Sequence, residues 1–288
     1  MNNLNIGDKK FNLNEKTLLM GILNITPDSF SDGGKYFSPD NAIKHALLME
    51  KQGADIIDIG GESTRPGAKK ISSNEEIKRV IPIIEEIVKK TNIPISIDTY
   101  KSKVAKKAID AGASMINDIS ALRFSKTLVN VVSEYETMIC LMHMKGTPRN
   151  MQNNPVYNDI INEIFLFLKE RTEFAIQNNI KKEKIIVDPG IGFGKRTGKG
   201  IEDNCEILEK LSKLKSLNFP IMVGASRKAF IGNICGNNKP ITIKERLYGS
   251  LAAACIAVIN GANIVRTHEI IETRRCLDLL DCVIRKKY

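Results

Sequence analysis

Short apolar runs alternate along the chain with longer amphipathic stretches. Eight runs are rich in β-branched and aliphatic residues without strict alternation, which is typical of strands buried on both faces of a parallel sheet. They cover residues 18–24, 55–60, 94–98, 114–118, 137–143, 184–188, 220–224 and 263–267. Between them, apolar residues recur at helical spacing, as in the sets Ile77, Ile81, Ile84, Val88 and Ile270, Leu277, Leu280, Ile284. Eight strands that alternate with eight helical stretches predict an α/β fold, the (β/α)8 TIM barrel.

The first residues of the chain follow a different pattern. Residues 4–14 (LNIGDKKFNLN) place a Gly-Asp pair between apolar residues. This pattern predicts a short hairpin within residues 1–14 that closes the bottom of the barrel. No linker, internal repeat or low-complexity tract divides the rest of the sequence. Because such barrels often use ~250 residues as one unit, the 288 residues predict a single domain over residues 1–288.

Composition narrows the range of partners. The formal charge is +10, but lysines are mixed with acids and no basic stripe is interleaved with aromatic residues, so we expect no nucleic-acid partner. The longest apolar run, residues 251–259, is far shorter than the ~20 residues of a membrane span, and the N-terminus lacks an apolar signal core. Six cysteines without CxxC spacing indicate reduced thiols. We therefore expect a cytoplasmic protein that does not bind membranes.

Polar side chains stand at or just after the end of every predicted strand. They are Asn24; Glu62, Ser63, Thr64 and Arg65; Asp98; Asn117 and Asp118; His143; Asp188; Ser226, Arg227 and Lys228; and Arg266 and His268. Asp, Asn, Ser and Thr also cap helices, which explains any one position equally well. Arg, Lys and His are not capping residues, however, and a barrel builds its active site at the C-terminal ends of its strands. The full set therefore predicts one site.

The segment ASRKAF after the seventh strand carries a local conflict. We expect Ser226 to cap the next helix, which puts Arg227 and Lys228 in its first turn, where the helix dipole disfavours cations. Such a conflict indicates an anionic or electron-rich ligand. Arg266 and His268 lie on the same side of strand eight, and barrels often bind phosphate near strands seven and eight, so we predict a phosphate or diphosphate site. A structural ion pair of Arg266 with an acid on a neighbouring helix is the alternative.

Residues 188–200 (DPGIGFGKRTGKG) contain glycines in the pattern of neither a P-loop nor a dinucleotide-binding motif. The glycines instead allow the backbone to approach a flat ligand closely, with Asp188 beneath it.

Eight motifs, taken in order, resemble dihydropteroate synthases along essentially the whole chain. They are GILNITPDSFSDGG, DIIDIGGESTRPGA, SIDTYKSKVA, MINDIS, LMHMKGTPRNMQ, IIVDPGIGFGK, VGASRKAFIG and RTHEI. The resemblance implies a (β/α)8 barrel, usually a homodimer. It also implies a transferase of folate biosynthesis that joins 6-hydroxymethyl-7,8-dihydropterin diphosphate to p-aminobenzoate and releases pyrophosphate, with Mg²⁺. Sulfonamides compete for the p-aminobenzoate site in this family.

The resemblance also assigns residues to parts of the site. Those for the pterin are Asp98, Asn117, Met142, Asp188, Phe193 and Lys228. Those for the diphosphate are Asn24, Thr64, Arg65, Arg266 and His268, with Asn24 also as the metal ligand. Those for p-aminobenzoate are Phe30, Pro66, Phe193 and Ser226. The implied catalytic residues are Asp98, Lys228 and Arg266.

The chemistry of these residues fits the implied reaction. A carboxylate such as Asp188 accepts two parallel hydrogen bonds from the N–H edge of a pterin, and Asn117 suits its amide face. The diphosphate leaves the pterin methylene first, so Arg266 and the metal stabilise the departing negative charge and Asp98 the positive pterin. Mg²⁺ bound mostly to diphosphate and water explains the lack of a carboxylate cage. By resemblance, residues 26–38 and 63–68 cover the diphosphate and complete the p-aminobenzoate pocket.

Two departures and two alternatives accompany the resemblance. Glu269 stands where the family more often has Asp, and Ala121 where Gly is common. Methyltetrahydrofolate:corrinoid methyltransferases share the pterin-binding barrel, but they need no diphosphate clamp of the kind that Arg65, Arg266 and His268 indicate. A catalytically silent pterin-binding protein is the other alternative, although no motif residue is missing.

Overall fold

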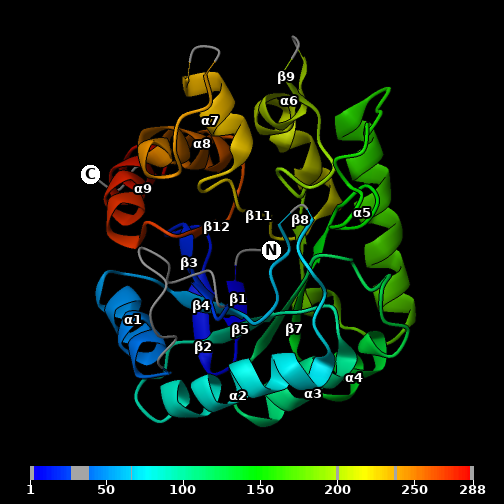
Figure 1. The fold of residues 1–288 in the computed structure, drawn as a ribbon, viewed down its shortest axis with the longest axis vertical. Helices are drawn as coiled ribbons and strands as arrows, with labels where there is room; N and C mark the ends of the chain where they lie inside the picture. Colours follow the sequence, from blue (N-terminus) through cyan, green and yellow to red (C-terminus); the bar gives the residue numbers. More distant parts are fainter. Residues whose placement is uncertain (1–2, 27–38, 66, 199–200, 237–238, 286–288) are drawn as a thin grey trace.

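Eight parallel strands form the centre of the molecule in a computed structural model, which describes residues 3–26, 39–65, 67–198, 201–236 and 239–285. Their order in the sheet is β11-β12-β3-β4-β5-β6-β7-β8. A parallel bridge between Val187 and Ile221 joins the two ends of this sheet. The strands thus surround a common centre with the helices outside (Figure 1), and the predicted (β/α)8 barrel is confirmed.

Each barrel strand lies within its predicted apolar run. The bounds are β3 Leu18–Asn24, β4 Ile56–Gly60, β5 Ile95–Asp98, β6 Met115–Asp118, β7 Met138–Met142, β8 Ile185–Asp188, β11 Met222–Val223 and β12 Ile264–Thr267. Strand β11 is much shorter than its run, because the backbone N–H of Ile221 donates to the Asn263 side chain rather than to a neighbouring strand.

Nine α-helices cover the barrel in the described part of the chain. They are α1 Pro39–Lys51, α2 Ser73–Val88, α3 Ser102–Asp110, α4 Leu128–Glu134, α5 Ile160–Gln177, α6 Asp203–Lys210, α7 Ala229–Cys235, α8 Leu247–Ile259 and α9 Ile270–Ile284. Three 3₁₀ turns join them: η1 Lys182–Lys184, η2 Leu211–Leu217 and η3 Lys244–Arg246. Helix α2 shows the predicted amphipathic design, since Ser72 caps it and Val80, Ile84 and Ile87 are buried.

The predicted N-terminal hairpin is present as β1 (Asn3–Ile6) and β2 (Lys9–Asn12), joined at Gly7. Leu4 and Ile6 are buried in one cluster with strand residues such as Leu18 and Met222, so the hairpin covers the barrel interior. Gly7 has a φ of 56°, which L side chains rarely adopt. A second hairpin, β9 (Thr197–Gly198) with β10 (Ile201–Glu202), lies in the glycine-rich segment and was not predicted.

In the ranges that the structure describes, no helix combines the length and apolarity that a bilayer crossing requires. All six cysteines are free thiols, as their spacing predicted.

Candidate active site

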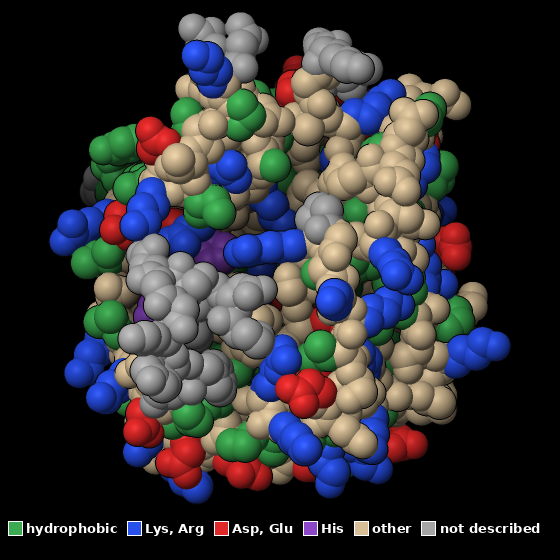
Figure 2. Space-filling view, viewed as in Figure 1, with side chains coloured by type: hydrophobic (Ala, Val, Ile, Leu, Met, Phe, Trp, Pro, Cys, Tyr) green, Lys and Arg blue, Asp and Glu red, His purple; other side chains and the backbone are tan. Residues whose placement is uncertain are grey.

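The C-terminal ends of the barrel strands bring the predicted residues together. Asn24 ends β3, Asp98 ends β5, Asp188 ends β8, and Asn117 and Arg266 lie one residue before the ends of β6 and β12. Figure 2 shows Lys and Arg side chains and a His side chain gathered at the middle of one face, beside the grey segment. One end of the barrel therefore carries both acids and cations.

Arg266 joins two carboxylates from neighbouring strands. Its Nε lies 2.6 Å from Asp58 Oδ2, and its Nη2 lies 2.9 Å from Asp98 Oδ2. Asp58, in the middle of β4, is fully buried and was missed from the sequence, although an acid within the apolar run DIIDIG was an available signal. Arg266 therefore pairs with strand acids of the site rather than with the helix acid that was the alternative.

The two carboxylates retain unused acceptors. Among the described residues, Oδ1 of Asp58 and Oδ1 of Asp98 are buried and have no hydrogen-bond partner. Burial raises the pKa of Asp98 to about 7, although Arg266 acts in the opposite direction. Burial also raises the pKa of Asp188 to about 6, against the Gly190 N–H that donates to its Oδ1 at 2.7 Å. These acids are poorly solvated and ready to accept hydrogen bonds from a ligand.

Asp58 fixes the orientation of the Asn117 side-chain amide. The Nδ2 atom of Asn117 donates to Asp58 Oδ2 at 2.9 Å. Because a carboxylate only accepts, the amide must present its NH₂ group to Asp58 and keep Oδ1 as its remaining acceptor. Asn117 is therefore an acceptor toward any ligand at this end of the barrel.

Lys228 and Phe193 lie against each other, and the charge of Lys228 acts on both Asp98 and Asp188. The Lys228 Nζ lies 4.2 Å from the centre of the Phe193 ring, a cation–π contact. Burial lowers the pKa of Lys228 to about 8. Phe193 packs on an apolar cluster that includes Met142, so both residues assigned to the pterin by resemblance lie on one surface.

The glycine-rich segment after β8 fits tightly against the strand-β7 side. Gly190 has a φ of 70°, and a Cβ atom there would lie 1.9 Å from the His143 carbonyl oxygen. Lys195 is fully buried, and its Nζ contacts Gly190 O and Phe193 O at 2.9 Å and His143 Nδ1 at 3.0 Å. Lys195 was also missed, because a lysine between glycines is ordinarily exposed.

Positive charge gathers around His268. Burial lowers the pKa of His268 to about 3, and Arg227, Arg266, Lys228 and Arg65 act in the same direction. Arg65 is exposed, and within the described ranges no hydrogen bond involves its guanidinium. The neighbouring Thr64 is half-buried. The arrangement provides an electropositive patch suited to an anion.

Ser226 does not cap helix α7, so that prediction was wrong. The helix begins at Ala229 after Lys228, without a side-chain capping bond, and Arg227 precedes it with a φ of 59°. Ser226 instead contacts His268 Nδ1 and Glu269 Oε2, each at 2.8 Å. The argument from the helix dipole therefore fails, and the prediction of an anion rests on the cluster of cations alone.

A buried ion cluster fixes the root of the loop that carries Arg65. Glu62 accepts from the Tyr100 hydroxyl at 2.7 Å, from the Ile71 N–H at 3.0 Å and from Lys101 at 2.5 Å. Lys101 also pairs with Glu76 at 2.6 Å. Both ends of residues 63–70 are thereby tied to the barrel.

Two further predictions concern a metal site and the p-aminobenzoate pocket. Within the described ranges, no three His, Cys, Asp or Glu side chains are placed to hold a metal ion. Phe30 and Pro66 lie outside the described residues.

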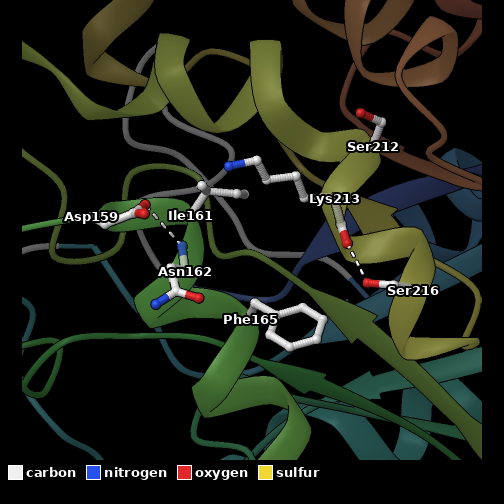
Figure 3. A pocket seen from close by; sticks show the side chains of 7 residues that line it. All are labelled: Asp159, Ile161, Asn162, Phe165, Ser212, Lys213 and Ser216. Atoms are coloured by element: carbon white, nitrogen blue, oxygen red, sulfur yellow. Dashed lines mark hydrogen bonds between the residues drawn. The ribbon is translucent and has the colours of Figure 1, made fainter.

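A separate surface pocket of about 400 Å³ lies between α5 and η2 (Figure 3) and contains none of the predicted residues. It is lined by Asp159, Ile161, Asn162, Phe165, Ser212, Lys213 and Ser216.

Comparisons with known proteins show the family of the chain. The family model for pterin binding enzymes matches residues 20–268. Dihydropteroate synthase of Clostridium beijerinckii is 44% identical, over 98% of this chain and 100% of that protein. The Yersinia pestis dihydropteroate synthase in a sulfonamide drug complex superimposes with a TM-score of 0.91 at 38% identity, over 98% of this chain and 99% of that one. The Xanthomonas albilineans enzyme with 4-aminobenzoic acid gives 0.89 at 39%, over 98% of both chains.

A barrel whose strand ends carry pterin-type acceptors and a cationic patch defines a pterin-binding enzyme. Within that class, the chain belongs to the dihydropteroate synthases, which are transferases of folate synthesis.

Proposed function

We propose that this chain joins 6-hydroxymethyl-7,8-dihydropterin diphosphate to p-aminobenzoate and releases pyrophosphate. The observation that carries the proposal is the junction at Arg266, which bonds Asp98 on the acidic side and lies among the cations on the other. A substrate that combines an N–H-rich ring with a diphosphate matches this division of charge.

The acidic side suits the pterin. Asp188, Asn117 and Asp98 supply acceptors, and Lys228, whose charge acts on Asp98 and Asp188, supplies a donor. Phe193 offers a flat apolar surface to the ring. When the diphosphate leaves, positive charge spreads into the pterin, and the nearby carboxylate of Asp98 stabilises it.

The cationic side suits the diphosphate. Arg65, Arg266 and His268 stabilise the negative charge that develops on the leaving oxygen, and Thr64 supplies a hydroxyl at the same loop. Asn24, at the end of β3, places a neutral oxygen close to Gly60 and Asp98.

The donor set fits Mg²⁺ only together with the substrate. Asn24 is one neutral oxygen ligand, and Mg²⁺ readily keeps diphosphate oxygens and water in its remaining positions. When bound, the ion neutralises charge on the diphosphate. We therefore expect Mg²⁺ to bind weakly to the free protein and tightly with pyrophosphate.

The p-aminobenzoate pocket is proposed from Phe193 and Ser226, with Phe30 and Pro66 outside the described residues. The Xanthomonas albilineans relative with 4-aminobenzoic acid supports an arylamine as the second substrate. Sulfonamides should compete with it, which the drug complex of the Yersinia pestis relative supports.

Helices α8 and α9 are the proposed contact of a homodimer. They pack side by side, and each exposes large apolar side chains: Tyr248 at 81%, Leu279 at 70% and Val283 at 61%. Exposed apolar area of this kind commonly marks a protein interface. Leu279→Glu should convert a dimer to monomers in sedimentation experiments. A cytoplasmic location stays a prediction from the sequence.

Pyrophosphate release tests the activity. We expect release from the pterin diphosphate with Mg²⁺ to require p-aminobenzoate and to be inhibited competitively by a sulfonamide. A methyltetrahydrofolate:corrinoid methyltransferase would release no pyrophosphate, and the comparisons do not favour that alternative.

A further inference from the structure

The hydroxyl of Ser226 has all its hydrogen-bonding capacity in use. Its Oγ donates to Glu269 Oε2 at 2.8 Å, lies 2.8 Å from His268 Nδ1, and accepts from the His268 backbone N–H at 3.3 Å. A hydroxyl has one proton and two acceptor lone pairs. Because a carboxylate can only accept, the single proton of Ser226 points to Glu269. The Nδ1 atom of His268 must therefore carry a proton and donate it to Ser226.

Glu269 is held in the orientation that the hydrogen bonds of Ser226 require. Arg227 donates to its Oε1, so its Oε2 faces Ser226. The side chain of Glu269 is largely buried. The sequence showed this residue only as a departure from the usual Asp of the family, and the structure gives it a partner.

His268 is neutral in this setting. Burial lowers its pKa, and so do Arg227 and Lys228 from the segment after β11, Arg266 from β12 and Arg65 from the loop after β4. Glu269 is the acid beside it. A neutral imidazole with its proton on Nδ1 has a bare lone pair on Nε2. In the parts of the chain that are described, no hydrogen bond involves that atom.

A diphosphate oxygen that approaches His268 therefore faces the Nε2 atom as one hydrogen-bond acceptor facing another. Diphosphate oxygens accept hydrogen bonds, and so does an unprotonated Nε2, so the two atoms bond only with a proton between them. We propose that Glu269, acting through Ser226, holds His268 as the Nδ1–H tautomer in the free protein, so that the diphosphate group binds there with uptake of one proton at Nε2. Glu269 and Ser226 are then positioning residues. The identity of the anion rests on the proposed function.

Glu269→Gln should reverse the tautomer by exchanging one atom. The Gln oxygen must face Arg227, which donates, so its NH₂ group faces Ser226. Ser226 then accepts from Gln and turns its own proton toward His268 Nδ1. The imidazole proton moves to Nε2, where it can donate to a phosphate oxygen without any proton uptake. Glu272→Gln is a matched control, because it makes the same change three residues further on, in the first turn of α9, at a residue without a hydrogen bond to Ser226 in the described part of the chain.

Nitrogen-15 NMR of the free full-length protein tests the tautomer directly. The chain has only three histidines, so each imidazole can be resolved. We expect His268 to show a protonated Nδ1 and an unprotonated Nε2 in the wild type and in Glu272→Gln, and the reverse in Glu269→Gln. A protonated Nε2 in the free wild type would overturn the proposal without any variant. This test needs no substrate, so its outcome is separate from the pyrophosphate-release assay.

Calorimetry of Mg²⁺-pyrophosphate binding, repeated in buffers with different ionisation enthalpies, measures the proposed proton uptake. The wild type should take up about one proton more than Glu269→Gln, and the ligand's own protons cancel in the comparison. Linkage then makes wild-type affinity fall about tenfold per pH unit relative to the variant as the pH rises. Equal proton uptake by the wild type and Glu269→Gln would contradict the proposal.

Discussion

The Nη2 atom of Arg266 lies 2.9 Å from Oδ2 of Asp98. One residue was predicted for the diphosphate and the other for the pterin, yet they form a single ion pair with little exposure to solvent. In the proposed function, this bond connects the group that would stabilise the leaving anion to the group that would stabilise the pterin. Changes at Arg266 should therefore affect both ends of the substrate unequally.

Arg266→Ala should reduce turnover of the pterin diphosphate far more than it weakens binding of the free hydroxymethyl pterin. The free pterin has no diphosphate to hold, and it retains Asp188 and Asn117. Steady-state kinetics and calorimetry check the two effects. Equal losses for both ligands would indicate a purely structural Arg266. Arg266→Lys keeps the charge but not the two-sided contact with Asp58 and Asp98, and should recover little activity.

Asp188→Asn should weaken pterin binding by roughly 2 to 4 kcal/mol, because one acceptor of a paired contact becomes a donor that faces a donor. Calorimetric titration measures the loss. In the wild type, protonation of Asp188 should weaken pterin binding about tenfold per pH unit as the pH falls below its pKa of about 6. Unchanged affinity in the variant would refute the role of Asp188.

The carboxylate of Asp188 should also limit the stability of the fold at higher pH. Its folded pKa is raised from 3.8 to about 6, so the folded state binds more protons than the unfolded state between these values. Its contribution to stability is therefore present at low pH and is lost as the pH rises through about 6. Asp188→Asn should raise the melting temperature at about pH 8 and change it less at about pH 4. A lower melting temperature at the higher pH would contradict this.

Asp58→Ala should impair both ends of the site, since it frees the Asn117 amide to rotate and removes a partner of Arg266. Asp58→Asn is the control, because its oxygen can still accept from both. We expect the Ala variant to lose at least about tenfold more pterin affinity than the Asn variant, in line with one lost charged hydrogen bond. Similar losses would mean that only the charge of Asp58 matters.

Gly190→Ala should destabilise the fold by about 3 kcal/mol or more, because strain at a positive φ adds to a clash with the His143 backbone. Gly198→Ala has a φ of 83° and meets no atom within 4 Å among the described residues. That control should lose only about 1 kcal/mol. Chemical denaturation separates the two, and equal losses would show that backbone strain alone sets the effect.

The sequence predicted the barrel, its hairpin and the strand ends because each depends on local patterns of apolar and polar residues. It did not predict which side chains would bond to one another. Asp58 and Arg266 are 208 residues apart, and only the closed barrel brings them together. Ser226 matched a helix cap locally, but its partners just after β12, His268 and Glu269, outweighed that preference. Lys195 is buried because a folded loop surrounds it with carbonyl oxygens.

The most direct test of the central claim is a product analysis with the full-length protein, the pterin diphosphate, p-aminobenzoate and Mg²⁺. Mass spectrometry should detect 7,8-dihydropteroate, formed in a one-to-one ratio with pyrophosphate and reduced together with it in Asp188→Asn and Arg266→Ala. Pyrophosphate released without dihydropteroate, or no product from a folded wild-type protein, would contradict the account.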